Sequence, residues 1–258
     1  MFELAFDVEG SGPDLLLVAG TASTRPIWSL VRPALARSYR TIAFDHRDSG
    51  ESTIASAPYG IHDLVADALA VLDAAGARRA HVLGHSMGGA VVQELALRHA
   101  SRCASLTLAC TWCRNDVYTT GAIELMSALT SSVGDDRTLL AAILYAGGSA
   151  ETLQSAGLFA KTDAAMALGP LPPRRALLRQ WAIDREVETL DRLHQLDLPV
   201  HVLWCPQDRM LPPPASQLLL TAIPHAAQTR IDGCGHLPMV DRPEAFAAAV
   251  TGFLARKR

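Results

Sequence analysis

The pattern of apolar and polar positions divides this chain into three parts. In the first part, short apolar runs alternate with segments whose apolar residues recur at helical spacing. The expected strands cover residues 3–9, 15–19, 41–45, 81–83 and 106–110, and the expected helices cover 28–37, 61–76 and 90–98. Continuous apolar runs are typical of strands buried on both faces. This alternation predicts an α/β fold with a parallel sheet and right-handed crossovers.

The alternation of strands and helices stops between residues 114 and 191. Only helical spacing is found there, and it predicts helices at residues 123–133, 138–145, 153–160 and 176–189. A segment of this length would hardly fold alone, so we expect a helical cap on the sheet. The alternation then returns, with strands at 200–204 and 228–231 and helices at 213–223 and 243–256. We therefore divide the chain into a core made of residues 1–113 and 192–258 and a cap made of residues 114–191.

Composition narrows the class of protein. Of the 258 residues, 49% are hydrophobic and 19% are charged, which is enough apolar material for a sizeable core. The net charge of -3 disfavours nucleic acid as a partner. No apolar run reaches the roughly 18–20 residues of a membrane span, and the first residues lack the pattern of a secretory signal. We expect a cytoplasmic protein with no membrane partner.

The five cysteines are expected to be reduced thiols. They are Cys103, Cys110, Cys113, Cys205 and Cys234, an odd number without a secretory leader. Cys110 and Cys113 form a C-x-x-C pattern, which as a redox or zinc site needs a helix N-terminus or a second pair. Neither is evident, so we interpret them as ordinary buried thiols.

One serine stands where a strand would turn sharply into a helix. Ser86 lies in Gly84-His85-Ser86-Met87-Gly88, between the strand at 81–83 and the helix at 90–98. Small neighbours are needed there because the strand and the helix nearly touch. The turn would expose the hydroxyl and place the Met87 N–H at a helix N-terminus. This is the nucleophile-elbow pattern.

A nucleophilic serine needs a base and an orienting acid. His236 follows the last expected strand and lies among glycines, so its loop can bend over the carboxyl edge of the sheet, where Ser86 should be. Asp208 follows the strand at 200–204 and is the preferred acid, with Asp116 as the second choice. Two other acidic residues, Asp45 and Asp48, are interpreted as stabilising their own loop through Arg47 and backbone amides.

Further residues are expected around Ser86. The N–H groups of Met87 and Thr21 are the candidate donors of an oxyanion hole. His85 either lines the pocket or packs beneath the elbow, and both interpretations stay open. Trp112 and Leu211 are candidate substrate-binding residues that could equally belong to the core.

Three motifs together resemble the α/β-hydrolase superfamily. They are the run from Gly84 to Gly89, the run from Trp204 to Pro212, and Gly235-His236 followed by Pro243-Glu244. The resemblance implies Ser86 as nucleophile, Asp208 as acid and His236 as base. It also implies a mostly parallel sheet of about seven or eight strands with a helical cap.

Two further segments refine the resemblance. The segment from Asp45 to Thr53, with Pro58-Tyr59-Gly60, resembles small carboxylic-ester hydrolases related to polyketide methylesterases, and more distantly enol-lactonases. The sequence departs from the family pattern in having Ala19-Gly20 where relatives commonly have His-Gly. It also has room for only one strand before Leu15, so the sheet is expected to have seven strands.

The expected activity is hydrolysis of a carboxylic ester, thioester or lactone of a small to medium apolar molecule through an acyl-enzyme. Neither a metal nor an organic cofactor is required. The same three residues also serve carbon–carbon bond hydrolysis, perhydrolysis or ring rearrangement, and receptors on this fold can keep them, so these alternatives stay open. Dehalogenases and epoxide hydrolases are disfavoured because their nucleophile is Asp. The oligomeric state is open, with a homodimer as one option.

Overall fold

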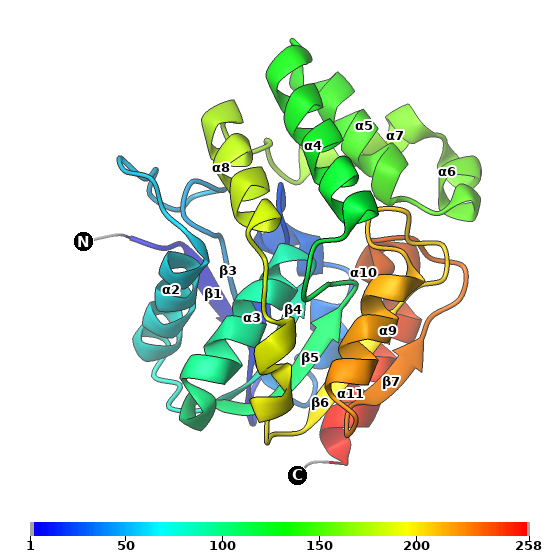
Figure 1. The fold of residues 1–258 in the computed structure, drawn as a ribbon. Helices are drawn as coiled ribbons and strands as arrows, with labels where there is room; N and C mark the ends of the chain where they lie inside the picture. Colours follow the sequence, from blue (N-terminus) through cyan, green and yellow to red (C-terminus); the bar gives the residue numbers. More distant parts are fainter. Residues whose placement is uncertain (1–2, 257–258) are drawn as a thin grey trace.

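The centre of the protein is one seven-stranded sheet (Figure 1). The computed structural model describes residues 3–256, apart from the side chain of Ala156. The strands are β1 (Phe6–Glu9), β2 (Asp14–Val18), β3 (Arg40–Phe44), β4 (Ala80–His85), β5 (Cys103–Ala109), β6 (Val200–Trp204) and β7 (Ala227–Arg230), in the order β1-β3-β2-β4-β5-β6-β7. Only β1 pairs antiparallel. The predicted fold class and the expectation of seven strands are confirmed.

Helices cover both faces of the sheet, as the apolar runs require. One face of the sheet carries α2 (Ile61–Ala74), α3 (Met87–Arg98), the 3₁₀ helices η2 (Ala100–Arg102) and η3 (Leu190–Gln195), and α9 (Pro213–Ala222). The other face carries η1 (Arg25–Trp28), α1 (Arg32–Leu35), α10 (Pro238–Asp241) and α11 (Pro243–Ala255). Successive strand residues point to opposite faces. Leu16 accordingly packs against α2 and α3, whereas Leu15 and Leu17 pack against α1 and α11.

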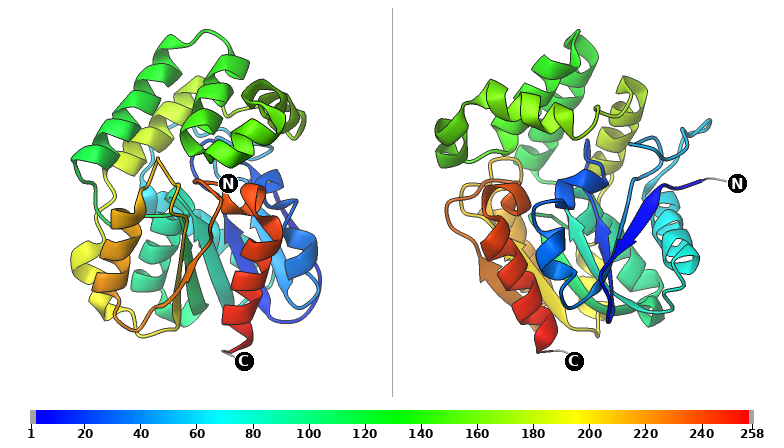
Figure 2. Two further views of the ribbon diagram at one scale, coloured as in Figure 1. Left: turned by 90° about the vertical axis from the view of Figure 1, so that its right-hand side faces the viewer. Right: turned by 180° about the vertical axis from the view of Figure 1, so that it is seen from behind.

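Five helices form a layer over the carboxyl ends of the parallel strands (Figures 1 and 2). They are α4 (Val117–Ser132), α5 (Asp136–Gly147), α6 (Ala150–Ala156), α7 (Leu158–Ala167) and α8 (Arg174–Arg185). We call them the cap helices. Ile123, Met126, Leu139, Leu177 and Trp181 make a small apolar cluster within this layer. Among the described residues, no helix is both long and apolar enough to cross a bilayer.

Two predicted helices are broken in the structure, and two others have different bounds, since α4 begins at Val117 rather than 123 and α8 ends at Arg185 rather than 189. The helix expected at 28–37 is replaced by η1 and the single turn α1. Pro26 and Pro33 stand near the starts of these elements, where proline is tolerated, and cannot continue a helix from before them. The helix expected at 153–160 is divided at Gly157, whose φ of 77° lies in the left-handed region, so that α6 ends there and α7 begins.

Candidate active site

Ser86 lies between β4 and α3 in a strained backbone conformation. Its φ is 54° and its ψ is -124°, a region that residues other than glycine rarely adopt. The neighbouring glycines explain how this turn is possible. A Cβ atom on Gly84 would lie 2.2 Å from the Gly88 carbonyl oxygen, and one on Gly88 would lie 2.2 Å from that of Val18. Strand and helix therefore approach so closely that only hydrogen fits at these two positions.

A continuous chain of hydrogen bonds runs from Ser86 through His236 to Asp208. The Ser86 Oγ lies 2.9 Å from His236 Nε2, and His236 Nδ1 lies 2.8 Å from Asp208 Oδ2. The other oxygen, Asp208 Oδ1, accepts the N–H groups of Met210 and Leu211 at 3.0 and 2.8 Å. A carboxylate beside Nδ1 keeps the proton on that nitrogen, which leaves Nε2 free to accept the serine proton.

The loop that carries His236 is held from two sides. The His236 N–H donates to the Gly147 carbonyl oxygen at the end of α5, and His85 Nε2–H donates to the His236 carbonyl oxygen at 2.7 Å. Burial, together with the nearby His236, lowers the pKa of His85 to about 3. His85 is therefore neutral near pH 7. It acts as a fixed hydrogen-bond donor to the backbone of its neighbour.

The loop after β2 passes directly beside Ser86. A Cβ atom on Gly20 would lie 2.8 Å from Ser86 Cβ, so the following residue, Thr21, begins next to the hydroxyl. The strand end before it is anchored by His46, whose Nε2 lies 2.9 Å from the Ala19 carbonyl oxygen. Met87 is the first residue of α3, so its N–H has no partner within the helix. Thr21 and Met87, the residues whose N–H groups are the candidate oxyanion donors, therefore both lie beside Ser86.

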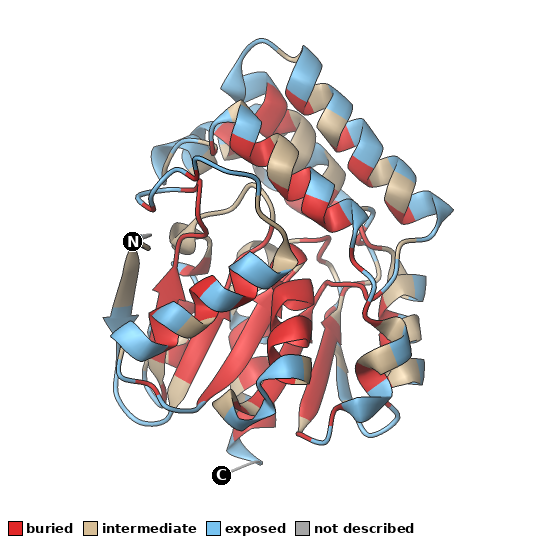
Figure 3. Ribbon diagram, turned by 60° about the vertical axis from the view of Figure 1, so that its left-hand side comes forward, coloured by how far each residue is buried: buried red, intermediate tan, exposed pale blue. Residues whose placement is uncertain are grey.

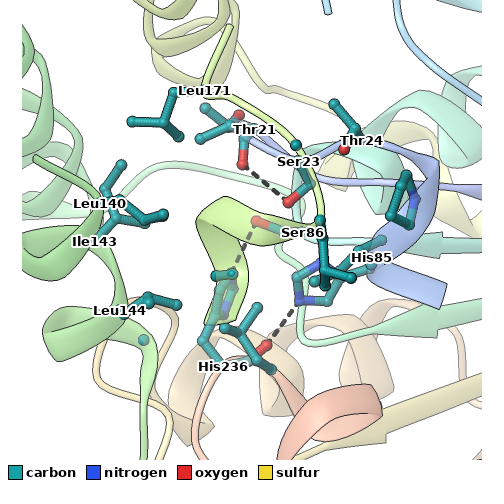
Figure 4. A pocket seen from close by; sticks show the side chains of 18 of the residues that line it. Thr21, Ser23, Thr24, His85, Ser86, Leu140, Ile143, Leu144, Leu171 and His236 are labelled. Atoms are coloured by element: carbon teal, nitrogen blue, oxygen red, sulfur yellow. Dashed lines mark hydrogen bonds between the residues drawn. The ribbon is translucent and has the colours of Figure 1, made fainter. Parts of the chain in front are cut away.

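Two cavities meet at Ser86 and His236. The larger, of about 130 Å³, is apolar along the side of the cap, where Leu140, Ile143 and Leu144 line it (Figure 4). The smaller, of about 20 Å³, lies below α4 and α8. Residues that line the smaller cavity include Trp112, Ile123, Trp181, Asp184 and Leu211. A molecule whose reacting atom is at Ser86 can therefore extend in two directions.

The predicted substrate-binding residues all lie near these cavities. His85 lines the larger cavity and also binds the backbone of the His236 loop. It is therefore both a pocket residue and a residue packed against its neighbours at the elbow. Trp112 and Leu211 line the smaller cavity and also pack together in a buried cluster with Ala90 and Val187. The pocket walls and the core are continuous at these two positions.

The other acidic candidates have different partners. Asp116 is the N-cap of α4 and accepts the Thr119 N–H at 2.7 Å, so it is not beside His236. Asp45 and Asp48 stabilise their loop, but the expected pairing with Arg47 is wrong. Arg47 reaches Asp67 on α2 instead, with its Nε 2.6 Å from the carboxylate. Residues distant in sequence supply the cations: Arg25 pairs with Asp45, and Arg179 of α8 pairs with Asp48.

The expectation of five reduced thiols is wrong. Cys205 and Cys234 form a disulfide, with their Cα atoms 5.7 Å apart. The end of β6 and the loop before His236 converge at the same edge of the sheet, and this proximity cannot be read from a separation of 29 residues. The interpretation of Cys110 and Cys113 is confirmed, because both are free and buried.

Sequence reasoning missed Asp184, which lines the smaller cavity. A signal for it does exist in the sequence. Leu177, Trp181 and Asp184 share one face of α8 at helical spacing, and all three are buried. A carboxylate on the apolar face of a helix is unusual enough to mark a functional position. The apolar residues of α5 were also missed, because spacing alone does not show which cap helix faces Ser86.

Comparison with known proteins identifies the family and the fold. A family model described as the alpha/beta hydrolase fold matches residues 13–243. The chain is 27% identical over 251 residues to the "Putative carbamate hydrolase RutD" of Azorhizobium caulinodans, covering 97% of this chain and 94% of that protein. A hydrolase structure from Pseudomonas aeruginosa PA01 has a TM-score of 0.87 at 29% identity, covering 98% of this chain and 94% of the other.

A more distant structure supports the fold alone. The enol-lactonase from Burkholderia xenovorans LB400 has a TM-score of 0.88 at 22% identity, covering 98% of this chain and 97% of the other. The chain belongs to the α/β-hydrolase fold family, as the motifs predicted. Within that family it is a hydrolase.

Proposed function

We propose that this chain is a serine hydrolase that cleaves the carboxylic ester, thioester or lactone of a small to medium apolar molecule in the cytoplasm through an acyl-enzyme. The observation that carries the proposal is the hydrogen-bonded chain Ser86–His236–Asp208 at the floor of an apolar cavity. A serine hydroxyl bonded to a histidine, which is in turn oriented by a carboxylate, is the arrangement that activates a serine.

The first half of the reaction forms the acyl-enzyme. Ser86 Oγ attacks the carbonyl carbon while His236 Nε2 takes the hydroxyl proton, and the carbonyl oxygen becomes an oxyanion. The N–H groups of Thr21 and Met87 donate to that oxyanion, where each donor typically contributes about 2.7–4 kcal/mol. The imidazolium of His236 then protonates the leaving group as the carbonyl re-forms. Asp208 stabilises the imidazolium and holds its tautomer.

The second half releases the acyl group. His236 takes a proton from water, the hydroxide attacks the acyl carbon, and the same two N–H groups stabilise the second oxyanion. Collapse of this intermediate expels Ser86 Oγ, which regains its proton from His236. The relative from Azorhizobium is named for carbamate hydrolysis, and carbamates react by the same two steps. Carbamates are therefore included among the acyl compounds to be assayed.

A fluorophosphonate label and an ester panel test this proposal. The wild-type protein should be labelled on Ser86 and should hydrolyse p-nitrophenyl esters, with a preference set by acyl length. Ser86→Ala should abolish labelling and lower kcat by about 10⁶-fold. A control for the same chemical change is Ser131→Ala, because Ser131 is exposed near the end of α4, where its hydroxyl donates to the Ser127 carbonyl oxygen. Full turnover in Ser86→Ala, or tight ligand binding by a wild-type protein that shows no turnover, would refute the proposal.

A further inference from the structure

The Thr21 loop, residues Gly20 to Ser23, makes a tight turn beside Ser86 (Figure 4). The Ser23 N–H donates to the Gly20 carbonyl oxygen at 3.2 Å, and the two central residues are Thr21 and Ala22. Ala22 has a φ of 60°, in the left-handed region. A residue with a Cβ atom adopts this region at a cost, and glycine is the usual residue at such a position of a turn. The turn therefore needs support from another part of the protein.

One cap helix, α8, supplies that support. Gln180 and Asp184 lie one turn apart on α8 and are only 1% and 2% exposed. Gln180 Oε1 accepts the Ala22 N–H at 3.0 Å. Asp184 Oδ2 accepts the hydroxyl hydrogen of Thr21 at 2.6 Å. Two successive residues of the Thr21 loop are thus each bound by a buried side chain of the same helix.

The partners of the Gln180 side chain fix its orientation. Its oxygen must face Ala22, because a backbone N–H group needs an acceptor. Its Nε2–H donates to Ser49 Oγ at 3.0 Å, on the loop after β3. Gln180 is not among the described residues that line the two cavities beside Ser86. It can therefore affect the reaction only through the loop that it holds.

The helix that carries Gln180 is itself attached to the core. Arg179 Nη1 lies 3.0 Å from Asp48 Oδ2 and 3.0 Å from the Ala55 carbonyl oxygen. Ile183 belongs to the main apolar core, together with residues of α2 and α3. A fixed helix can hold the Thr21 loop as closely as an oxyanion donor requires, because a displacement of about 1 Å can lower a rate about 100-fold.

We infer that Gln180 is a positioning residue for the oxyanion hole, because by binding the Ala22 N–H it holds the turn in the conformation that directs the Thr21 N–H to the oxyanion. Asp184 is the second attachment of the same loop. This inference rests on the proposed function, which places the oxyanion beside Ser86. It assigns to the cap a part of the reaction rate as well as the choice of substrate.

Gln180→Met tests this role, because methionine has a similar length and fills the same space without an amide oxygen. We expect kcat for phenyl acetate to fall about 10-fold while KM changes by less than about twofold, since the loss falls on the transition state. Gln180→Glu keeps an oxygen opposite the Ala22 N–H and should retain more of the kcat. Gln154→Met makes the same chemical change on the exposed side of α6 and should leave kcat unaltered. A wild-type kcat in Gln180→Met, or a loss confined to KM, would overturn the inference.

A second substitution separates support of the turn from general damage to the cap. Glycine adopts a φ of 60° without the cost that alanine bears, so Ala22→Gly in the Gln180→Met protein should restore kcat about fivefold. In the wild-type protein the same substitution should change kcat by less than about twofold, because Gln180 already holds the turn. If kcat is not restored, Gln180 acts elsewhere and the inference is overturned. If Gln180→Met does not fold, the same comparison is made with Gln180→Glu.

Binding of phenylboronic acid keeps this inference separate from the proposed function. Ser86 Oγ adds to the boron atom, and the tetrahedral adduct carries an oxygen where the oxyanion would lie. Its Kd should rise about 10-fold in Gln180→Met, whereas the Kd of phenyl acetate for a Ser86→Ala protein should change by less than about twofold when Gln180→Met is added. Wild-type turnover with a boronate Kd that does not depend on Gln180 would overturn the inference and leave the proposed function standing. A boronate Kd that depends on Gln180 without wild-type turnover would support the inference and refute the proposed function.

Discussion

The sheet and the cap helices are built in different ways. The central strands β2 to β6 are buried on both faces, the edge strands β1 and β7 are partly exposed, and the catalytic candidates stand at the carboxyl ends of strands (Figure 3). The cap has a small apolar cluster of its own and leaves many large apolar side chains in contact with solvent. The exposed ones in the cap are Val117, Tyr118, Leu125, Tyr145, Phe159, Met166 and Leu168, whereas the rest of the described chain has only Val8, Leu30 and Ile54.

Apolar contacts join the two regions, since Ile183 of α8 belongs to the main core, and polar links join them at the site. Gln180 of α8 accepts the Ala22 N–H at 3.0 Å, Asp184 binds the Thr21 hydroxyl, and the His236 N–H donates to Gly147 of α5. The sheet therefore carries the reacting groups, while the cap contacts both the candidate oxyanion loop and the histidine loop. Changes in the sheet should affect the chemistry and the folding, and changes in the cap should affect the choice of substrate and, at Gln180, the oxyanion hole.

The largest effect is expected at Asp208. In Asp208→Asn the amide oxygen would stay on the N–H groups of Met210 and Leu211, so the NH₂ group would face His236 Nδ1. His236 would then hold its proton on Nε2 and could not accept the proton of Ser86. We expect kcat to fall about 10⁴-fold with the fold retained. Asp116→Asn is the matched control, because Asn also caps helices. A fall of less than about 10-fold in Asp208→Asn would contradict the assignment.

The second-largest effect is a pH dependence of the folding stability, and it comes from Asp184 in the cap. The pKa of Asp184 is about 7 in the folded protein against 3.8 for an ordinary Asp. The folded state therefore binds the proton more tightly, and the stability that this contributes is present below pH 4 and is lost as the pH rises through about 7. The loss amounts to at most about 4 kcal/mol.

Urea unfolding at pH 5 and pH 8 measures this loss. Asp184→Asn should be more stable than the wild type at pH 8, and its advantage should shrink at pH 5. Asp163→Asn serves as the control, since its carboxylate is exposed and ionised in both states over this range. An advantage of Asp184→Asn that is the same at both pH values would show that charge burial is not its cause.

Glycine substitutions compare the two regions directly. Gly88→Ala would place a Cβ atom 2.2 Å from the Val18 carbonyl oxygen, where only backbone can move. We expect it to lower the free energy of unfolding by about 3 kcal/mol or more. Gly121 lies in α4, where an added Cβ atom would meet nothing within 4 Å, so Gly121→Ala should raise stability by about 0.5–1 kcal/mol. Similar effects at both positions would remove the distinction between sheet and cap.

The smallest effect is expected on the outer side of the cap. Arg137 of α5 and Asp163 of α7 form an exposed ion pair, and exposed pairs contribute little. Asp163→Asn should leave the Tm unchanged within error and the kcat/KM for phenyl acetate within about twofold. A clear loss of activity would mean that the position of α7 matters for the site.

Much of the site was predictable because its residues follow strand ends. The apolar runs predict parallel strands, and parallel strands bring their carboxyl ends to one edge, so Ser86, Asp208 and His236 were expected together. The partners of Arg47 and the disulfide between Cys205 and Cys234 were not predictable. Both depend on which loops face each other across that edge of the sheet. The number of residues between two positions does not show which loops these are.

By itself, the sequence determined the fold class, the elbow and the three residues that could react. These features come from local spacing: two-sided burial of strands, close approach at Gly84 and Gly88, and the order of the loops. Only the tertiary structure decided what surrounds the reacting groups. The cap helices are amphipathic, and such periodicity says which face is buried but not against what. Asp184 acquired its unpaired oxygen, its raised pKa and its place beside Ser86 only when α8 packed onto the Thr21 loop.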